Sequence, residues 1–194
     1  MSSPIIAFLS TRKSAPINEM TEPGPSDEQL ETMLRIASRV PDHGKLAPWR
    51  FILYRGEARL EVGKHLVALA EQHEGPLAEG RRHQEATRFS RAPLVIGVVF
   101  VPKPHPKIPD WEKFLSAGAA AMNLCLAANA LGFATNWISN WYSDDPEGRR
   151  LLGLRHDERV AGFVHVGTHS GAIFERPRPD LAEIVSDYAG PTEA

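Results

Sequence analysis

The chain has 194 residues, and its 42% hydrophobic content is enough for one domain with a buried core. Its formal net charge of −2 and pI near 6.4 lack the basic excess that favours nucleic acids or anionic membranes, so we expect a small-molecule partner, with no nucleic acid and no membrane. The first residues include no basic region and only a short apolar run, which does not fit a secretory signal. The sequence therefore predicts a cytoplasmic protein.

The first predicted element is a short apolar helix over residues 4–10, which leads into a basic cluster. Arg12, Lys13 and Ser14 offer two cationic groups and a hydroxyl, which together suit a terminal phosphate. The alternative is a solvated basic turn, since short basic clusters are common on protein surfaces.

A capping box opens the next predicted helix, because Ser26 is followed by Gln29 and by apolar residues at helical spacing. This helix must end before Pro41. Residues 39–50 then place a cation, an imidazole, a glycine turn and an aromatic ring ahead of the following strand. Loops held between rigid elements commonly carry binding groups, so we expect this loop and the basic cluster to bind one phosphorylated ligand together.

The middle of the chain predicts a sheet with helical connections. Residues 49–54 predict a strand, residues 57–72 a helix, and the charged segment 77–90 a surface helix or a lid. The unbroken apolar run of residues 93–101 predicts a strand buried on both faces, at the centre of the sheet. The alternating prolines of residues 101–109 exclude helix and central strand, so we expect an extended loop, with polyproline recognition as its alternative role.

A long uncharged stretch follows the proline loop. Asp110 is expected to cap a helix that runs through Leu131 and ends at Gly132. Residues 115–143 contain no charged residue, but they include four asparagines, which are costly in hydrocarbon and argue against a membrane span. A helix that is apolar all round predicts burial inside the protein or between two copies of it.

The remaining elements complete an alternation of strands and helices. Residues 134–139 predict a short strand, Asp145-Pro146 the start of a helix, and residues 159–167 the last strand. The tail, residues 177–194, carries apolar residues without a closed pattern, so we expect it to pack on a partner subunit. The alternation predicts an α/β or α+β fold, with helices on both faces of a sheet, in a single domain over residues 1–194.

Several common sites are absent from the sequence. No Gly-x-Gly-x-x-Gly follows a predicted strand and no Gly-Lys-Ser/Thr occurs, which argues against a Rossmann dinucleotide site and a P-loop. His165 and His169 would stand about 13 Å apart on an extended chain, so no metal site is predicted. Cys125, the single cysteine, is expected to be a buried packing residue.

The order of the motifs is more specific than any one of them. They are the basic-basic-Ser cluster at residues 12–14, Arg-x-Pro-Asp-His-Gly at 39–44, Pro-Trp-Arg-Phe at 48–51, Ser-Arg-Ala-Pro at 90–93, Trp-Glu at 111–112, Ser-Ala-Gly at 116–118, Gly-Phe at 132–133 and 162–163, and Gly-Thr at 167–168. This order resembles the small, minimal members of the nitroreductase family of FMN-dependent enzymes, nearly end to end.

The resemblance implies an α+β fold with α/β/α layers, a central and mainly antiparallel sheet with helices on both faces, and an obligate homodimer. It also implies two FMN molecules at the dimer interface, with ping-pong hydride transfer from NADH or NADPH to a nitroaromatic, quinone or related acceptor. Because the cofactor supplies this chemistry, we expect no catalytic side chain and no metal. A non-catalytic flavin-binding dimer, acting as a carrier or regulator, is the alternative.

The resemblance further implies which side chains bind the flavin. Arg12, Lys13 and Ser14 would hold the FMN phosphate and ribityl chain. Arg39 and His43 would reach the flavin from the other subunit.

The isoalloxazine ring would be lined by a second set of residues, Trp137, Ile138 and Ser139. Two departures from the family pattern affect the edge of the ring. Lys45 and Ala47 stand where the family often has Asn and Gln, and Lys45 is a candidate to stabilise the anionic reduced flavin near N1.

Overall fold

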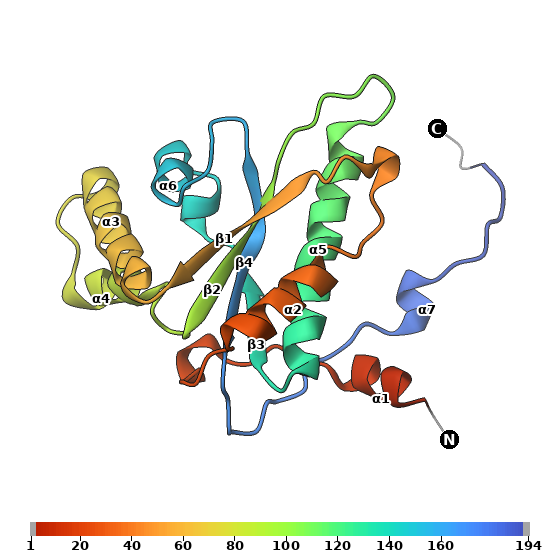
Figure 1. The fold of residues 1–194 in the computed structure, drawn as a ribbon, viewed down its shortest axis with the longest axis horizontal. Coiled ribbons are helices and arrows are strands. Elements are labelled where there is room, and N and C mark those ends of the chain that lie inside the picture. The colour runs from red at the N-terminus through yellow and green to blue at the C-terminus, as the bar shows by residue number, and fades with distance from the viewer. Residues whose placement is uncertain (1–2, 192–194) are drawn as a thin grey trace.

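A computed structural model describes residues 3–191. Its elements, in chain order, are α1 (Pro4–Thr11), α2 (Asp27–Ala37), β1 (Trp49–Arg55), α3 (Glu57–Glu74), α4 (Glu79–Thr87), β2 (Leu94–Phe100), α5 (Asp110–Ala130), β3 (Ala134–Ile138), α6 (Pro146–Leu151), β4 (Arg159–Gly167) and α7 (Leu181–Ile184) (Figure 1). The ends of the predicted domain and tail, residues 1, 2 and 192–194, lie outside the described residues.

The sheet has four strands in the order β1-β2-β4-β3, and every neighbouring pair is antiparallel. All residues of β2 are buried, as its unbroken apolar run predicts. The proline-rich residues 101–109 form the expected loop between β2 and α5. The prediction of an antiparallel sheet with a buried central strand is therefore confirmed.

Helices cover both faces of the sheet, as predicted (Figure 1). Leu94, Ile96 and Val98 of β2 pack with α2 and α5, whereas the alternate residues Val95 and Val99 pack with side chains of α3. This alternation is the period of a strand with two buried faces.

Cys125 lies in the core on the α5 side of the sheet and is 4% exposed. Its burial raises the pKa of the thiol to about 11, so the thiol stays protonated. The prediction of a packing residue is confirmed.

Local capping signals are largely confirmed. Ser26 accepts a hydrogen bond from the amide of Gln29, whose side chain accepts one from the amide of Ser26. The prediction for Asp110 is wrong, because the residue at the N-cap of α5 is Pro109 and Asp110 is already inside the helix. Its carboxylate lies 2.6 Å from the Lys113 ammonium instead.

The charged segment 77–90 forms the surface helix α4 and not a loose lid. Glu85 of this helix is fully buried, and its carboxylate accepts hydrogen bonds from Arg88 at 2.6 and 2.5 Å and from the Trp141 indole at 3.2 Å. Arg81 also pairs with it. The arginine contacts are internal to the helix and its C-cap, whereas the Trp141 contact ties α4 to the body of the protein, on the face of the sheet opposite α5 (Figure 1).

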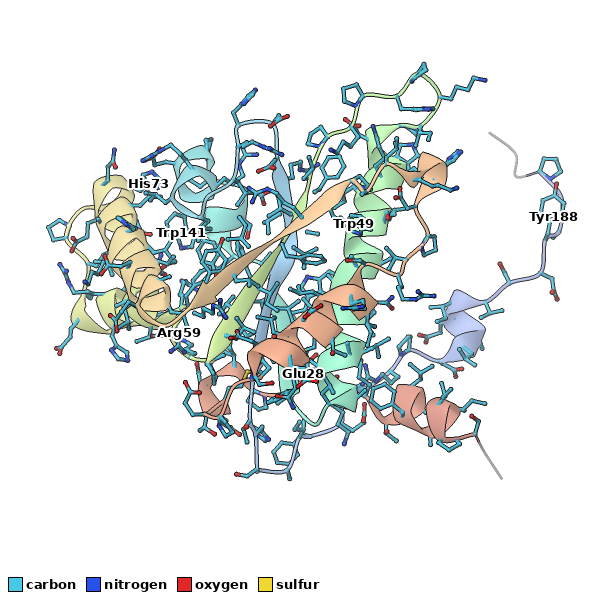
Figure 2. The ribbon with its side chains drawn as sticks, in the orientation of Figure 1. Glu28, Trp49, Arg59, His73, Trp141 and Tyr188 are labelled. Atoms are coloured by element: carbon cyan, nitrogen blue, oxygen red, sulfur yellow. The ribbon has the colours of Figure 1, made fainter. Side chains whose placement is uncertain are left out.

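The two ends of the described chain leave this layered body. Figure 1 shows α1 and the segment around α7 projecting beyond the sheet and its helices. Apolar side chains on them are exposed, and Figure 2 shows Tyr188 standing clear of the body. None of the helices within residues 3–191 has the length and apolar character needed to cross a membrane.

Candidate functional site

The basic cluster lies at the end of α1, beside a hollow of about 600 Å³. Arg12 and Lys13 line this hollow together with Asn129 of α5, and the loop between α5 and β3 forms another part of its wall. Ser14 is half-buried next to them but is not among the described residues that line the hollow. The structure thus brings the two predicted cations, but not the hydroxyl, to one concave surface.

The edge of the sheet holds this cluster in place. The amide of Ala15 donates to the carbonyl of Thr135 at 3.0 Å, and the side chain of Asn136 donates to the carbonyl of Ala15 at 2.6 Å. Because β3 is an edge strand, its outer backbone groups are free to bind the segment that follows α1.

The two cations of the hollow differ in their partners. The Lys13 ammonium donates to the carbonyl of Ile173 at 3.0 Å and lies 3.6 Å from the Glu175 carboxylate, so the chain's own tail engages it. Arg12 forms no ion pair with any residue in the range 3–191. It is therefore the cation available to an anionic ligand.

His169 is a lining residue that the sequence analysis missed. Its side chain is 2% exposed, and its Nε2 atom lies 3.0 Å from the Glu19 carboxylate. Its Nδ1 atom is buried and has no partner among the described residues, which is uncommon for a buried polar atom. The only sequence signal for this position was its place just after the last strand.

The second loop has an unusual backbone. Both oxygens of Asp42 accept hydrogen bonds from backbone amides, those of Leu46 at 3.1 Å and Ala47 at 2.8 Å. Gly44, Lys45 and Ala47 have φ values of 76°, 55° and 44°. Asn tolerates this left-handed region better than Lys or Ala, so the two departures from the family pattern fall at positions of backbone strain.

His43 lies at the opposite end of the site from the basic cluster. Its Nδ1 atom is 2.6 Å from the Glu112 carboxylate of α5, and both side chains border a second hollow of about 330 Å³. Arg39 is exposed, and the Asn123 side chain donates to its carbonyl at 2.9 Å, eleven residues along α5 from Glu112. Glu112 orients the imidazole, a role that no pattern in the sequence indicated.

His43 and the basic cluster do not meet within one chain. His43 contacts α5 at Glu112, whereas Arg12 and Lys13 share their hollow with Asn129. Seventeen helical steps separate these two positions of α5, about 25 Å at 1.5 Å per residue. One small ligand cannot touch both groups of the same protomer.

The predicted ring-lining residues lie at the end of β3. Trp137 is 38% exposed, and its indole donates to the carbonyl of Ala161 at 3.2 Å. The indole lies so close to Gly162 that a Cβ there would be 1.9 Å from its Nε1 atom. Ile138 is half-buried and ends the strand, while Ser139 is exposed one residue beyond it.

Trp137 faces the same side of the sheet as α5, because it pairs with Val164 in the core beneath that helix. Ala134, at the start of β3, lines the larger hollow, so Trp137 stands about 10 Å further along the strand. Because the two residues are three positions apart, their side chains point to opposite faces of the strand.

An apolar surface runs along the outer side of α5. Trp111 and Leu115 are 66% and 62% exposed, and Met122 and Leu126 continue the stripe at helical spacing with half-buried side chains. Apolar side chains are also exposed on α1 and near α7, among them Ile5, Ile6, Leu9, Phe174, Leu181, Ile184, Val185 and Tyr188. Apolar surface of this extent marks an interaction site.

Comparisons with known proteins agree with this architecture. A sequence model described as the nitroreductase family matches residues 20–168. A Haemophilus influenzae protein named "Putative NAD(P)H nitroreductase" is 39% identical over 164 residues, covering 84% of this chain and 87% of its own. The Escherichia coli protein of the same name, YdjA, is 35% identical over 167 residues, with the same coverage of both chains.

Solved structures with the same fold include two that cover nearly the whole chain. A nitroreductase-like family protein from Bacillus cereus has a TM-score of 0.81 at 23% identity, covering 98% of each chain. A nitroreductase with bound FMN from Bacteroides fragilis has a TM-score of 0.71 at 20% identity, covering 96% of this chain and all of its own. With the match over residues 20–168 and relatives above 30% identity, the chain belongs to the nitroreductase family.

Proposed function

We propose that this protein is an FMN-dependent NAD(P)H oxidoreductase that works as a homodimer with two composite flavin sites. In each site, Arg12, Lys13 and Ser14 of one protomer bind the phosphate and ribityl chain, and residues 137–139 line the ring. Arg39 and His43 come from the other protomer.

The observation that carries this proposal is the separation of the two half-sites along α5. Arg12 and His43 lie near opposite ends of a helix segment about 25 Å long, so one copy of the chain offers each flavin only half of its contacts. A second copy, with its α5 antiparallel to the first, would bring the end that carries His43 to the end that carries Arg12.

The residues around the larger hollow fit a flavin phosphate. Arg12 has no carboxylate partner in the described chain, and a guanidinium binds phosphate oxygens through two parallel hydrogen bonds. Lys13 would exchange the Glu175 carboxylate for the phosphate, which costs little because this exposed ion pair is weak. The unpartnered Nδ1 atom of His169 adds a polar group to the wall of the hollow.

The apolar outer side of α5 supports the dimer. A large apolar surface exposed to water is unfavourable, and a second α5 would cover Trp111 together with the half-buried Met122 and Leu126. The uncharged residues 115–143 also suit an obligate interface, whose composition resembles that of a protein interior. The projecting tail around α7 would then lie against the partner subunit.

Bound FMN would supply the hydride chemistry between NAD(P)H and an acceptor such as a nitroaromatic or quinone. The chain's part is to hold the flavin and to leave one side of the ring open. The Glu112 carboxylate holds His43 at 2.6 Å, so the imidazole reaches the composite site in one orientation. We expect no indispensable acid or base among the side chains.

Subunit complementation tests the composite site directly. Arg12→Gln and His43→Gln each damage both sites of a homodimer, and loss of a charged hydrogen bond to phosphate should weaken FMN binding about tenfold or more. In a mixed dimer of the two variants, one site carries both lesions and the other carries neither. We expect the mixed dimer to recover about half of the tightly bound FMN and of the NAD(P)H oxidation.

Recovery of neither flavin nor activity in the mixed dimer would refute the composite site. Arg35→Gln is the matched control, because Arg35 is an exposed cation on α2 whose one ion-pair partner within residues 3–191 is Glu31. Steady-state oxidation of NADH and NADPH with menadione or a nitrofuran then separates enzyme from carrier. A dimer that binds FMN stoichiometrically but turns over neither nucleotide is the non-catalytic flavin protein.

A further inference from the structure

Four exposed cations lie on the two loops that form part of the wall of the smaller hollow beside His43. Arg39 and Lys45 belong to the loop that follows α2, and Lys103 and Lys107 to the proline loop before α5. All four are exposed, and none forms an ion pair with a residue in the described range. We call these four residues the cationic rim.

The two loops of the cationic rim form one surface. Gly44 lies against Ile108, since a Cβ on the glycine would be 2.8 Å from the Cδ1 atom of the isoleucine. The buried Lys113 ammonium donates to the carbonyl of Lys103 at 2.6 Å and so fixes the proline loop to α5. Figure 1 shows both loops beside the start of this helix.

The carboxylates near the cationic rim are already engaged. Asp42 accepts two backbone amides of its own loop, Glu112 contacts His43 at 2.6 Å, and Asp110 lies 2.6 Å from Lys113. The chain as a whole carries a net charge of −2, so positive charge without a counterion is concentrated here. Such a concentration attracts an anionic ligand.

The hollow itself offers a different surface. Pro41, Ile108, Leu115 and Ala119 give it apolar walls, and its volume of about 330 Å³ lies within the range of small-ligand pockets. A ligand that fits both features has a flat, weakly polar ring joined to a phosphate. His43 borders this hollow, so the ligand would also approach the flavin of the composite site.

We propose that the hollow and the cationic rim bind the adenosine 2′-phosphate part of NADPH, so that the enzyme prefers NADPH to NADH. This inference rests on the proposed function and names its electron donor. NADPH differs from NADH by one phosphomonoester, which carries a charge between −1.5 and −2 at neutral pH. Lys103 and Lys107 are the side chains that would bind the 2′-phosphate and so distinguish NADPH from NADH.

The test compares both nucleotides with the wild-type holoenzyme and a Lys103→Gln/Lys107→Gln double variant. Two exposed ion pairs to one phosphate are together worth about a tenfold change, so the KM for NADPH should rise about tenfold. The KM for NADH, the kcat and the bound FMN should stay unchanged. Raised salt should weaken NADPH binding in the wild type more than in the variant.

The control variant removes the same charge elsewhere. Lys64→Gln/Arg82→Gln affects exposed cations of α3 and α4, on the other side of the sheet, and should leave both KM values unchanged. A wild-type enzyme that uses NADH as well as NADPH would overturn the proposal. An equal rise of both KM values in the double variant would also overturn it, as would loss of FMN, which would assign the cationic rim to the flavin phosphate.

A binding measurement separates this inference from the proposed function. Calorimetry with 2′,5′-ADP and with 5′-AMP reports the 2′-phosphate without any turnover. We expect 2′,5′-ADP to bind the flavin-loaded wild type more tightly than 5′-AMP, and the double variant to lose this difference. If the protein oxidises neither nucleotide, the enzymatic proposal fails alone, while equal affinity for the two probes refutes the cationic rim as a phosphate site.

Discussion

The contact between Trp137 and Gly162 gives the sharpest prediction, because it tests both the packing of β3 on β4 and the flavin site. A Cβ added at position 162 would lie 1.9 Å from Nε1 and 2.5 Å from Cδ1 of the indole. No heavy atoms approach this closely, so in Gly162→Ala the indole must leave its place and lose its hydrogen bond to the Ala161 carbonyl.

The size of the effect follows from the clash. Overpacking typically costs about 1–3 kcal/mol, and the lost hydrogen bond adds about 1 kcal/mol. The clash and the lost hydrogen bond together should lower the free energy of unfolding by about 2–4 kcal/mol, and the strain of a non-glycine residue at a φ of 153° adds about 1–3 kcal/mol. In a Trp137→Ala background the indole is gone, and only the backbone strain remains. The coupling between the two positions is then about 2–4 kcal/mol.

Urea unfolding of the four proteins in this double-mutant cycle measures the coupling, and absorbance of the bound flavin is the second readout. We expect Gly162→Ala to retain less FMN than the wild type, since the displaced indole no longer lines the proposed site. Equal costs of Gly162→Ala in the two backgrounds would show that the indole does not rest on the glycine, and the placement of Trp137 would be refuted.

Three further predictions concern stability. Burial lowers the pKa of His165 to about 4, so below pH 6.5 the unfolded chain binds more protons than the folded chain. The free energy of unfolding should therefore fall by about 2 kcal/mol between pH 6.5 and 5. Urea unfolding of His165→Gln at the same two pH values should not show this loss. Glu85→Gln leaves the buried Arg88 without its charged partner and should lower the free energy of unfolding in urea by about 3–5 kcal/mol. Glu147→Gln, at an exposed ion pair, should lower it by less than about 1 kcal/mol. Similar costs of the two substitutions would contradict the burial of the Glu85–Arg88 pair. Ala47→Gly relieves a φ of 44° and should raise the melting temperature, with a lower value counting against the strained loop.

The sequence alone determined those features that depend on neighbouring residues. The apolar run of β2 required a strand buried on both faces, the Ser26 capping box began a helix, and the alternating prolines before α5 required a loop. Each of these signals acts over a few residues, where local sterics and hydrogen bonding dominate. Asp110 shows the limit of such signals, because a shift of one position turned an expected cap into an ion-pair partner.

Only the tertiary structure decided which distant residues meet. The spacing along the chain indicated that residues 12–14 and 39–50 share one ligand, yet the position of α5 that His43 contacts lies about 25 Å along the helix from the position beside Arg12 and Lys13. The contact of His43 with Glu112, the buried His169 and the four cations without counterions likewise join segments that are remote in sequence. The length of a helix and the order of the strands set these distances. Residues brought together in this way share no periodicity or composition by which the sequence could show that they meet.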